Sequence, residues 1–81
     1  MFKIFTTEAC RFCKLAKSAL DARGYDYEEV AVTEEIKAQL VAIGLKTVPQ
    51  IYHQREGVLA PTHVGGYEDL VRYLGELEDA E

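Results

Sequence analysis

The chain has little of what marks several large classes of protein. It contains two prolines and six glycines among 81 residues, and 48% of its residues are hydrophobic, so it is not a disordered segment. No apolar stretch reaches the roughly 18 residues of a transmembrane helix, and the N-terminus lacks the pattern of a secretion signal. Two cysteines are too few for a secreted disulfide scaffold. We therefore expect one folded domain over residues 1–81, located in the cytoplasm.

Positive charge is also scarce. The chain has 9 Lys and Arg residues against 14 Asp and Glu residues, which gives a formal net charge of −5. This balance weighs against nucleic acid as a partner, because such binding relies on Lys and Arg to neutralise phosphates. Acidic residues gather near the C-terminus, and we expect residues from about 78 to 81 to form a frayed, solvated tail.

Strand-like and helix-like patterns follow one another along the chain. Alternating apolar residues predict a strand at about 2–6, and the helical periodicity that follows predicts a helix at about 11–23, ending at Gly24. The further predictions are a strand within 25–32, a helix between Thr33 and Gly44, strands at about 50–53 and 62–64, and a last helix after Gly65-Gly66. The predicted core faces of the three helices are Leu15, Ala16, Ala19, Leu20 and Ala22, then Ile36, Leu40 and Ile43, then Leu70, Val71, Leu74 and Leu77.

This order, β-α-β-α-β-β-α, predicts an α/β protein with a four-stranded mixed sheet. The first two strands, joined by a helix, should be parallel, and the last two should form an antiparallel hairpin. Helices are expected on both faces of the sheet. The absence of a surplus apolar face on the predicted helices favours a monomer.

Both cysteines lie in Cys10-Arg11-Phe12-Cys13, where the first strand gives way to a helix. A helix that begins here places Cys10 at the positive end of the helix dipole, which favours the reactive thiolate over the thiol. Cys13 lies on the same side of the first turn, close enough to form a disulfide with Cys10. This spacing beside a βαβ pattern is typical of a thioredoxin-like redox motif.

Two further blocks accompany this motif in order, Thr47-Val48-Pro49-Gln50-Ile51 and Gly65-Gly66-Tyr67-Glu68-Asp69-Leu70. With all three blocks, the chain resembles a glutaredoxin of the small dithiol type found in bacteria and phages, within the thioredoxin-fold superfamily. The resemblance spans nearly the whole chain. It implies a glutathione-dependent oxidoreductase that reduces protein disulfides or glutathionylated thiols, with ribonucleotide reductase as one expected partner. Cys10 would be the nucleophile, Cys13 would resolve the mixed disulfide, and no metal is expected.

The resemblance also implies a glutathione site. The Val48–Pro49 bond is expected to be cis, so that Val48 offers its N–H and C=O to the cysteine of glutathione like an added strand. Gly66 and the helix start behind it would receive the γ-glutamyl carboxylate, and Asp69 would face the ammonium group. The residues expected to bind glutathione are Arg11, Phe12, Lys37, Thr47, Val48, Pro49, Gly66, Tyr67, Glu68 and Asp69.

Lys37 is the candidate for the basic residue that meets the glycine carboxylate of glutathione. Its alternative is an ordinary solvated lysine, with Gln39 as the second candidate for the role. The chain departs from the family pattern at Arg11, where relatives commonly have proline, and at Thr7, which is often lysine. Residues 53–62 also form a longer connection than the usual tight hairpin.

Four other interpretations compete with this one. The Arg23-Gly24-Tyr25-Asp26-Tyr27-Glu28 stretch resembles redoxins that thioredoxin reductase reduces, and Arg11 leaves open a [2Fe–2S] cluster shared by two subunits with glutathione as co-ligand. A zinc site of Cys10, Cys13, His53 and His63 is disfavoured because structural zinc ligands have closer spacing. A purely structural disulfide is disfavoured too, since so small a loop constrains the unfolded chain little.

Overall fold

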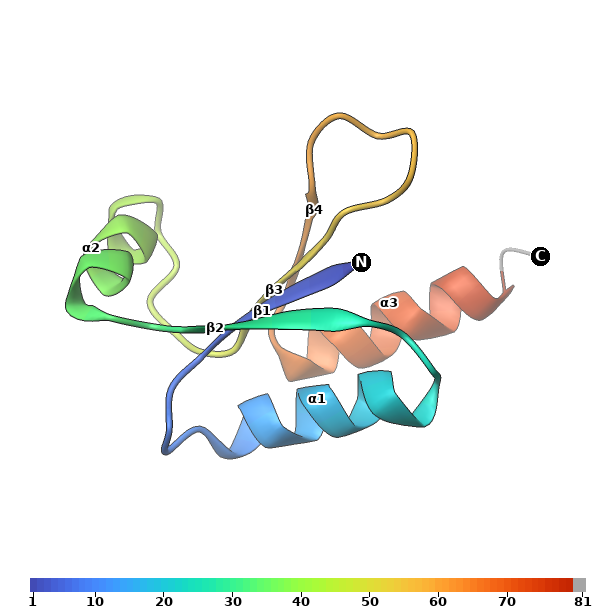
Figure 1. Ribbon diagram of the computed structural model, residues 1–81, viewed down its shortest axis with the longest axis horizontal. Coiled ribbons are helices and arrows are strands. Elements are labelled where there is room, and N and C mark those ends of the chain that lie inside the picture. Colours follow the sequence, from blue (N-terminus) through green and yellow to red (C-terminus); the bar gives the residue numbers. More distant parts are fainter. Residues whose placement is uncertain (80–81) are drawn as a thin grey trace.

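The computed structural model describes residues 1–79, which form seven elements in the predicted order (Figure 1). The strands and helices are β1 (Phe2–Thr6), α1 (Arg11–Ala22), β2 (Tyr27–Ala31), α2 (Glu34–Ala42), β3 (Gln50–His53), β4 (Thr62–Gly65) and α3 (Tyr67–Asp79). The strand predicted within residues 25–32 covers only Tyr27–Ala31. Tyr25 is not part of it, because its backbone N–H donates to the carbonyl of Leu20 at the end of α1.

The four strands form one mixed sheet in the order β2-β1-β3-β4. β1 is parallel to β2 and antiparallel to β3, and β4 is antiparallel to β3. The predicted parallel pair and antiparallel hairpin are therefore confirmed. No helix of residues 1–79 is long and apolar enough to cross a membrane.

The core lies between the sheet and the helices α1 and α3. Because side chains alternate along a strand, Phe2 and Ile4 of β1 point to the same face as Ile51 of β3. α1 and α3 pack side by side against this face (Figure 1). The fully buried side chains of this core are Phe2, Ile4, Ala16, Leu20, Ile51, Leu70 and Leu74.

Four residues of the predicted helix faces are exposed and lie outside this core. Leu15 and Val71 are 40% and 41% exposed, because each lies one position away from a buried residue and so at the edge of its helix's apolar stripe. Ala22, at the end of α1, is exposed as well. Ile43 is 66% exposed, since α2 ends at Ala42 and Ile43 is its C-cap.

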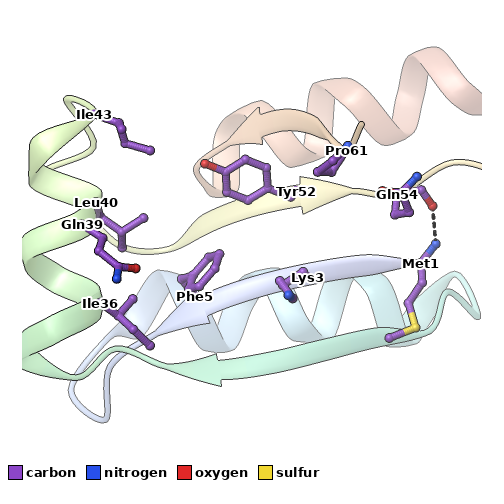
Figure 2. Close-up of a pocket in the computed structure, with 10 residues that line it drawn as sticks. All are labelled: Met1, Lys3, Phe5, Ile36, Gln39, Leu40, Ile43, Tyr52, Gln54 and Pro61. Atoms are coloured by element: carbon purple, nitrogen blue, oxygen red, sulfur yellow. Dashed lines mark hydrogen bonds between the residues drawn. The ribbon is translucent and has the colours of Figure 1, made fainter. Parts of the chain in front are cut away.

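The opposite face of the sheet carries α2 at one end and is otherwise open. Leu40 is the one buried residue of this helix. Beside it runs an apolar groove of about 720 Å³, which helical periodicity alone does not predict (Figure 2). The groove is lined by Met1, Lys3, Phe5, Ile36, Gln39, Leu40, Ile43, Tyr52, Gln54 and Pro61.

The C-terminal helix extends further than the composition predicts. α3 continues through Glu78 and Asp79, where we expected a frayed tail to begin. Glu78 accepts a hydrogen bond of 2.8 Å from the guanidinium Nε of Arg23, which links the C-terminal ends of α3 and α1. The remaining tail residues, Ala80 and Glu81, lie outside the described residues.

An aromatic cluster closes the end of the core near the N-terminus. The ring of His53 stacks on Phe2 at a centroid distance of 4.1 Å, and its Nδ1 lies 2.7 Å from the hydroxyl oxygen of Tyr73. Burial lowers the pKa of His53, and the positive charges of the N-terminal amine and Arg55 lower it further. The folded chain therefore favours neutral His53.

This shift predicts a loss of stability on mild acidification. Between the lowered folded-state pKa and the unfolded value of about 6.5, the unfolded chain binds more protons, so the free energy of unfolding falls as the pH falls. Urea denaturation between pH 7.5 and 5 should show this slope in the native chain and a smaller slope in His53→Phe. An equal slope in native chain and His53→Phe would contradict the assignment to His53.

Candidate active site

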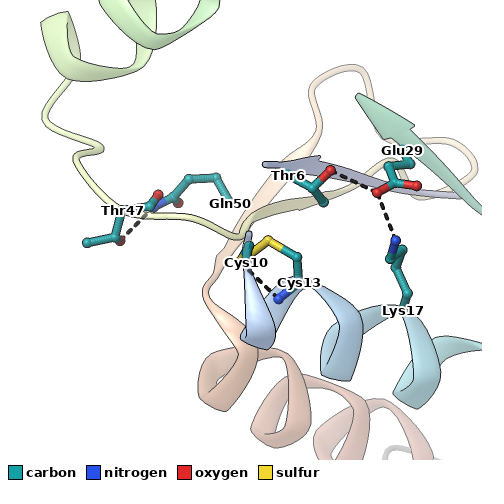
Figure 3. The surroundings of a disulfide bond; sticks show 7 residues. All are labelled: Thr6, Cys10, Cys13, Lys17, Glu29, Thr47 and Gln50. Carbon is teal, nitrogen blue, oxygen red and sulfur yellow. Dashed lines mark hydrogen bonds and ion pairs between the residues drawn. A yellow bond between two sulfur atoms is a disulfide. The ribbon is translucent and has the colours of Figure 1, made fainter. Parts of the chain in front are cut away.

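The two cysteines form a disulfide at the first turn of α1, with their Cα atoms 5.2 Å apart (Figure 3). Cys10 is the N-cap residue of the helix, and its Sγ accepts a hydrogen bond of 3.1 Å from the backbone N–H of Cys13. Cys13 is 1% exposed and Cys10 is 9% exposed. A reactant that approaches from solvent therefore reaches the sulfur of Cys10 before that of Cys13.

The surroundings of Cys10 favour a negative charge on its sulfur. The first turn of α1 contains no acidic residue, so no carboxylate within that turn opposes the partial positive charge of the helix N-terminus. The Cys13 N–H that now meets the disulfide is available to a Cys10 thiolate after reduction. Arg11 is exposed and adds positive charge in the same turn.

A polar network lies beside the disulfide, on the far side of Cys13 from the N-terminus of α1 (Figure 3). Glu29 of β2 accepts hydrogen bonds from Lys17 Nζ at 2.9 Å and from the buried Thr6 hydroxyl at 2.8 Å. The bond from Lys17, followed by that from Thr6, lowers the pKa of Glu29, and the same pairing raises the pKa of Lys17. Glu29 is therefore ionised at neutral pH.

Sequence reasoning did not identify this network. Lys17 could have been found, because it lies one helical turn after Cys13 and so on the same face of α1. Glu29 could not, since its place beside Thr6 depends on the register of the parallel β1–β2 pair, in which Ile4 faces Glu29 and Thr6 faces Ala31.

A pocket of about 220 Å³ lies between the start of α1, the loop before β3 and the start of α3. Phe12 and Tyr67 stack at a centroid distance of 6.1 Å at this pocket. The Val48–Pro49 peptide bond is cis, as the resemblance implies. The residues that line the pocket are Phe12, Thr47, Val48, Pro49, Gly66, Tyr67, Glu68 and Asp69, all of which belong to the predicted binding set.

The basic candidates lie outside this pocket. Lys37 lines a neighbouring pocket of about 340 Å³ that shares Thr47 and Val48 with the first. Lys46 lines it too and was missed, although its position next to Thr47 was a signal. Arg11 lines neither pocket, and Gln39 lines the apolar groove on the open face of the sheet.

Asp69 caps the helix that closes the pocket. Its carboxylate accepts a hydrogen bond of 3.3 Å from the backbone N–H of Gly66, the residue before α3. Gly65 has a positive φ of 116°, and a Cβ at this position would collide with the Asp69 carboxylate. The turn therefore requires glycine at residue 65, both for its φ and for the space beside Asp69. The Asp69 carboxylate in turn places a negative charge at the N-terminus of α3.

The two histidines belong to other parts of the fold. His53 pairs with Tyr73 in the core, and His63 Nε2 lies 2.9 Å from Gln50 Oε1. Within residues 1–79, no three His, Cys, Asp or Glu side chains are grouped as metal ligands. The alternative zinc set of two cysteines and two histidines is thus not assembled.

Comparison with known proteins places the chain among glutaredoxins. The glutaredoxin family model matches residues 2–58. A glutaredoxin of Pseudomonas aeruginosa is 40% identical over 70 residues, which cover 83% of this chain and 76% of the relative.

Solved structures of glutaredoxins are also similar to this chain. The solution structure of glutaredoxin from Brucella melitensis is 31% identical, with a TM-score of 0.71 over 96% of this chain and 84% of that one. A crystal structure of buckwheat glutaredoxin in complex with glutathione has a TM-score of 0.67 over 98% of this chain and 69% of that one. At 21% identity, the buckwheat protein supports the shared fold alone.

The turn at Gly65 should be the least tolerant of the glycine positions near the site. Gly65→Ala is expected to lower the free energy of unfolding by about 1–3 kcal/mol, because of its φ and the collision with Asp69. Gly75→Ala, inside α3 with open space around it, is the matched control and should raise stability by up to about 1 kcal/mol. Urea denaturation of the oxidised proteins measures both. Equal effects of the two substitutions would contradict the proposed constraint.

Proposed function

The chain belongs to the glutaredoxin family and is a thiol–disulfide oxidoreductase, and we propose that glutathione is its reductant. The observation that carries this proposal is the pocket that brings Val48, Gly66 and Asp69 together beside the helix start that bears Cys10. The resemblance implies a glutathione contact for each of these three residues. Their presence in one cavity supports a single binding site.

On glutathionylated proteins the reaction needs Cys10 alone. The Cys10 thiolate attacks the glutathione sulfur of the mixed disulfide, and the protein cysteine leaves as a thiolate. A second glutathione thiolate then attacks the glutathione sulfur bound to Cys10. Glutathione disulfide leaves, and the Cys10 thiolate is regenerated.

On protein disulfides the reaction uses both cysteines. Cys10 attacks one sulfur of the substrate and forms a mixed disulfide with the protein, and Cys13 then attacks Cys10 and releases the protein as a dithiol. This leaves the Cys10–Cys13 disulfide. Two glutathione molecules reduce that disulfide in turn and become glutathione disulfide.

Each part of glutathione has a complementary element at the pocket. The backbone of Val48 would pair with the glutathione cysteine, and the N-terminus of α3 at Gly66 would receive the γ-glutamyl carboxylate. Asp69 would face the ammonium group. Lys37 and Lys46, in the adjoining pocket that shares Val48, are the cations available to the glycine carboxylate. The buckwheat glutaredoxin that shares this fold has been solved in complex with glutathione.

The proposal extends to partners and location. Glutaredoxin potentials of roughly −200 to −230 mV suit a cytosolic glutathione pool, so we place the protein in the cytoplasm. We propose that it acts as a monomer of one domain on disulfide-containing or glutathionylated proteins. Ribonucleotide reductase is the specific protein substrate that the family resemblance favours.

Substitution of each cysteine should affect the two types of substrate differently. Cys10→Ser should abolish the reduction of both substrate types, because it removes the attacking sulfur. Cys13→Ser should retain turnover of a glutathionylated peptide and lose the reduction of protein disulfides that depend on resolution. Coupled assays with glutathione, glutathione reductase and each substrate measure both variants. Equal loss of turnover in the two variants on the glutathionylated peptide would contradict this division of roles.

The choice of reductant tests the pocket. Glutathione with glutathione reductase should reduce the Cys10–Cys13 disulfide faster than thioredoxin reductase does. Asp69→Asn should raise the KM for a glutathionylated peptide about tenfold with little change in kcat, because it removes a charge that meets the ammonium group. Glu76→Gln, an exposed acid on the same helix and outside the pocket lining, is the matched control and should leave KM near the native value. Reduction by thioredoxin reductase alone would reject the glutathione site and favour the competing redoxin function.

A further inference from the structure

The loop that carries Val48 has few attachments of its own. Leu45 is tied to α2 by its N–H bond to the carbonyl of Leu40, and regular sheet pairing begins at Gln50. Between them, among the described residues, the hydrogen bonds to residues 46–49 come from the side-chain amide of Gln50. Its Nε2 donates to the Thr47 carbonyl at 2.8 Å and lies 3.3 Å from the Thr47 hydroxyl.

The direction of these bonds determines which partner Gln50 needs. The backbone carbonyl of Thr47 can only accept a hydrogen bond, so the amide nitrogen of Gln50 must face it. The amide oxygen then faces His63, whose Nε2 lies 2.9 Å away. Because that oxygen can only accept, His63 must carry its hydrogen on Nε2. The chain of donors therefore runs from His63 through Gln50 to Thr47.

The sheet brings these residues to one face. Gln50 and Tyr52 alternate with the core residue Ile51 along β3, and Tyr52 pairs with His63 of β4 across the strands. The ring of His63 packs on Tyr52 at a centroid distance of 5.0 Å, which restricts where its Nε2 can point. Gln50 itself is only 5% exposed, so an amide oxygen without a partner would be costly there.

We propose that His63 and Gln50 are positioning residues for the glutathione-binding edge. His63 holds the Gln50 amide in one orientation, and that amide holds Thr47 and so the neighbouring backbone of Val48. Without the donor of His63, the amide can rotate or turn toward water, and the loop loses its tie to the sheet. This inference rests on the proposed function, because it assigns the two residues to the binding of glutathione.

The kinetic test compares variants that differ in the donor. His63→Phe keeps a ring against Tyr52 and removes the donor, and it should raise the KM for a glutathionylated peptide about 2- to 10-fold with kcat changed little. His63→Gln restores a donor and should recover part of the loss. Gln50→Glu, which replaces the donor to Thr47 by a carboxylate oxygen, should raise KM more than His63→Phe does. His53→Phe, the matched control on the opposite face, should leave KM near the native value.

Two readouts separate this effect from general destabilisation. Reduction of the Cys10–Cys13 disulfide by dithiothreitol does not depend on the backbone of Val48, so the rate of this reduction should be unchanged in His63→Phe. The NMR order parameters of the backbone amides of residues 46–48 should fall in His63→Phe and stay native in His53→Phe. Unchanged order parameters in both His63→Phe and Gln50→Glu would overturn the proposal.

The same measurements distinguish failure of this inference from failure of the proposed function. If the order parameters fall but the KM for the glutathionylated peptide stays native, His63 positions the loop and the loop does not bind glutathione. That result overturns the role in binding and rejects Val48 as the glutathione edge. If the order parameters fall and KM rises with kcat retained, and His63→Gln recovers both, the proposal is supported.

Discussion

Strand β1 lies between β2 and β3 and makes hydrogen bonds with both, so its position determines where the rest of the molecule can lie. Its inward side chains, Phe2 and Ile4, form the centre of the core that α1 and α3 cover. Its end at Thr6 leads within four residues to Cys10. The sheet therefore holds the start of α1, and with it the two cysteines, beside the loop that leads into β3.

The site contains two helix N-termini, which face different groups. The start of α1 presents its N–H groups to the sulfur of Cys10, and the start of α3 presents its own to the pocket. Asp69 already occupies the N–H of Gly66, so a ligand carboxylate at this end would share the helix start with a protein carboxylate. An ammonium group on the same ligand would offset that repulsion, so the proposed γ-glutamyl group, which carries both charges, would suit this end of the pocket.

Sequence patterns were reliable where one local rule decided the outcome. Alternation predicted the bounds of β1, and the residue types at Thr33 and Gly24 predicted the start of α2 and the end of α1. They were less reliable at the edges of apolar stripes. Leu15 and Val71 fit a helical face by periodicity, but both lie at the margin of the buried stripe and are 40% and 41% exposed. The continuation of α3 through Glu78, which pairs with Arg23, was likewise outside the reach of composition.

The sequence by itself determined the order of elements and the two cysteines at a helix start, because both depend on neighbours within a few residues, and the family resemblance identified the three blocks that contribute to the pocket. Only the tertiary structure decided the partners of those blocks. Glu29 joins Thr6 and Lys17 through the parallel register, and His63 reaches Gln50 through the pairing of β3 with β4. Lys37 and Gln39 lie two residues apart on α2, yet they line different cavities. Such placements follow from how strands and helices pack, which no local pattern encodes.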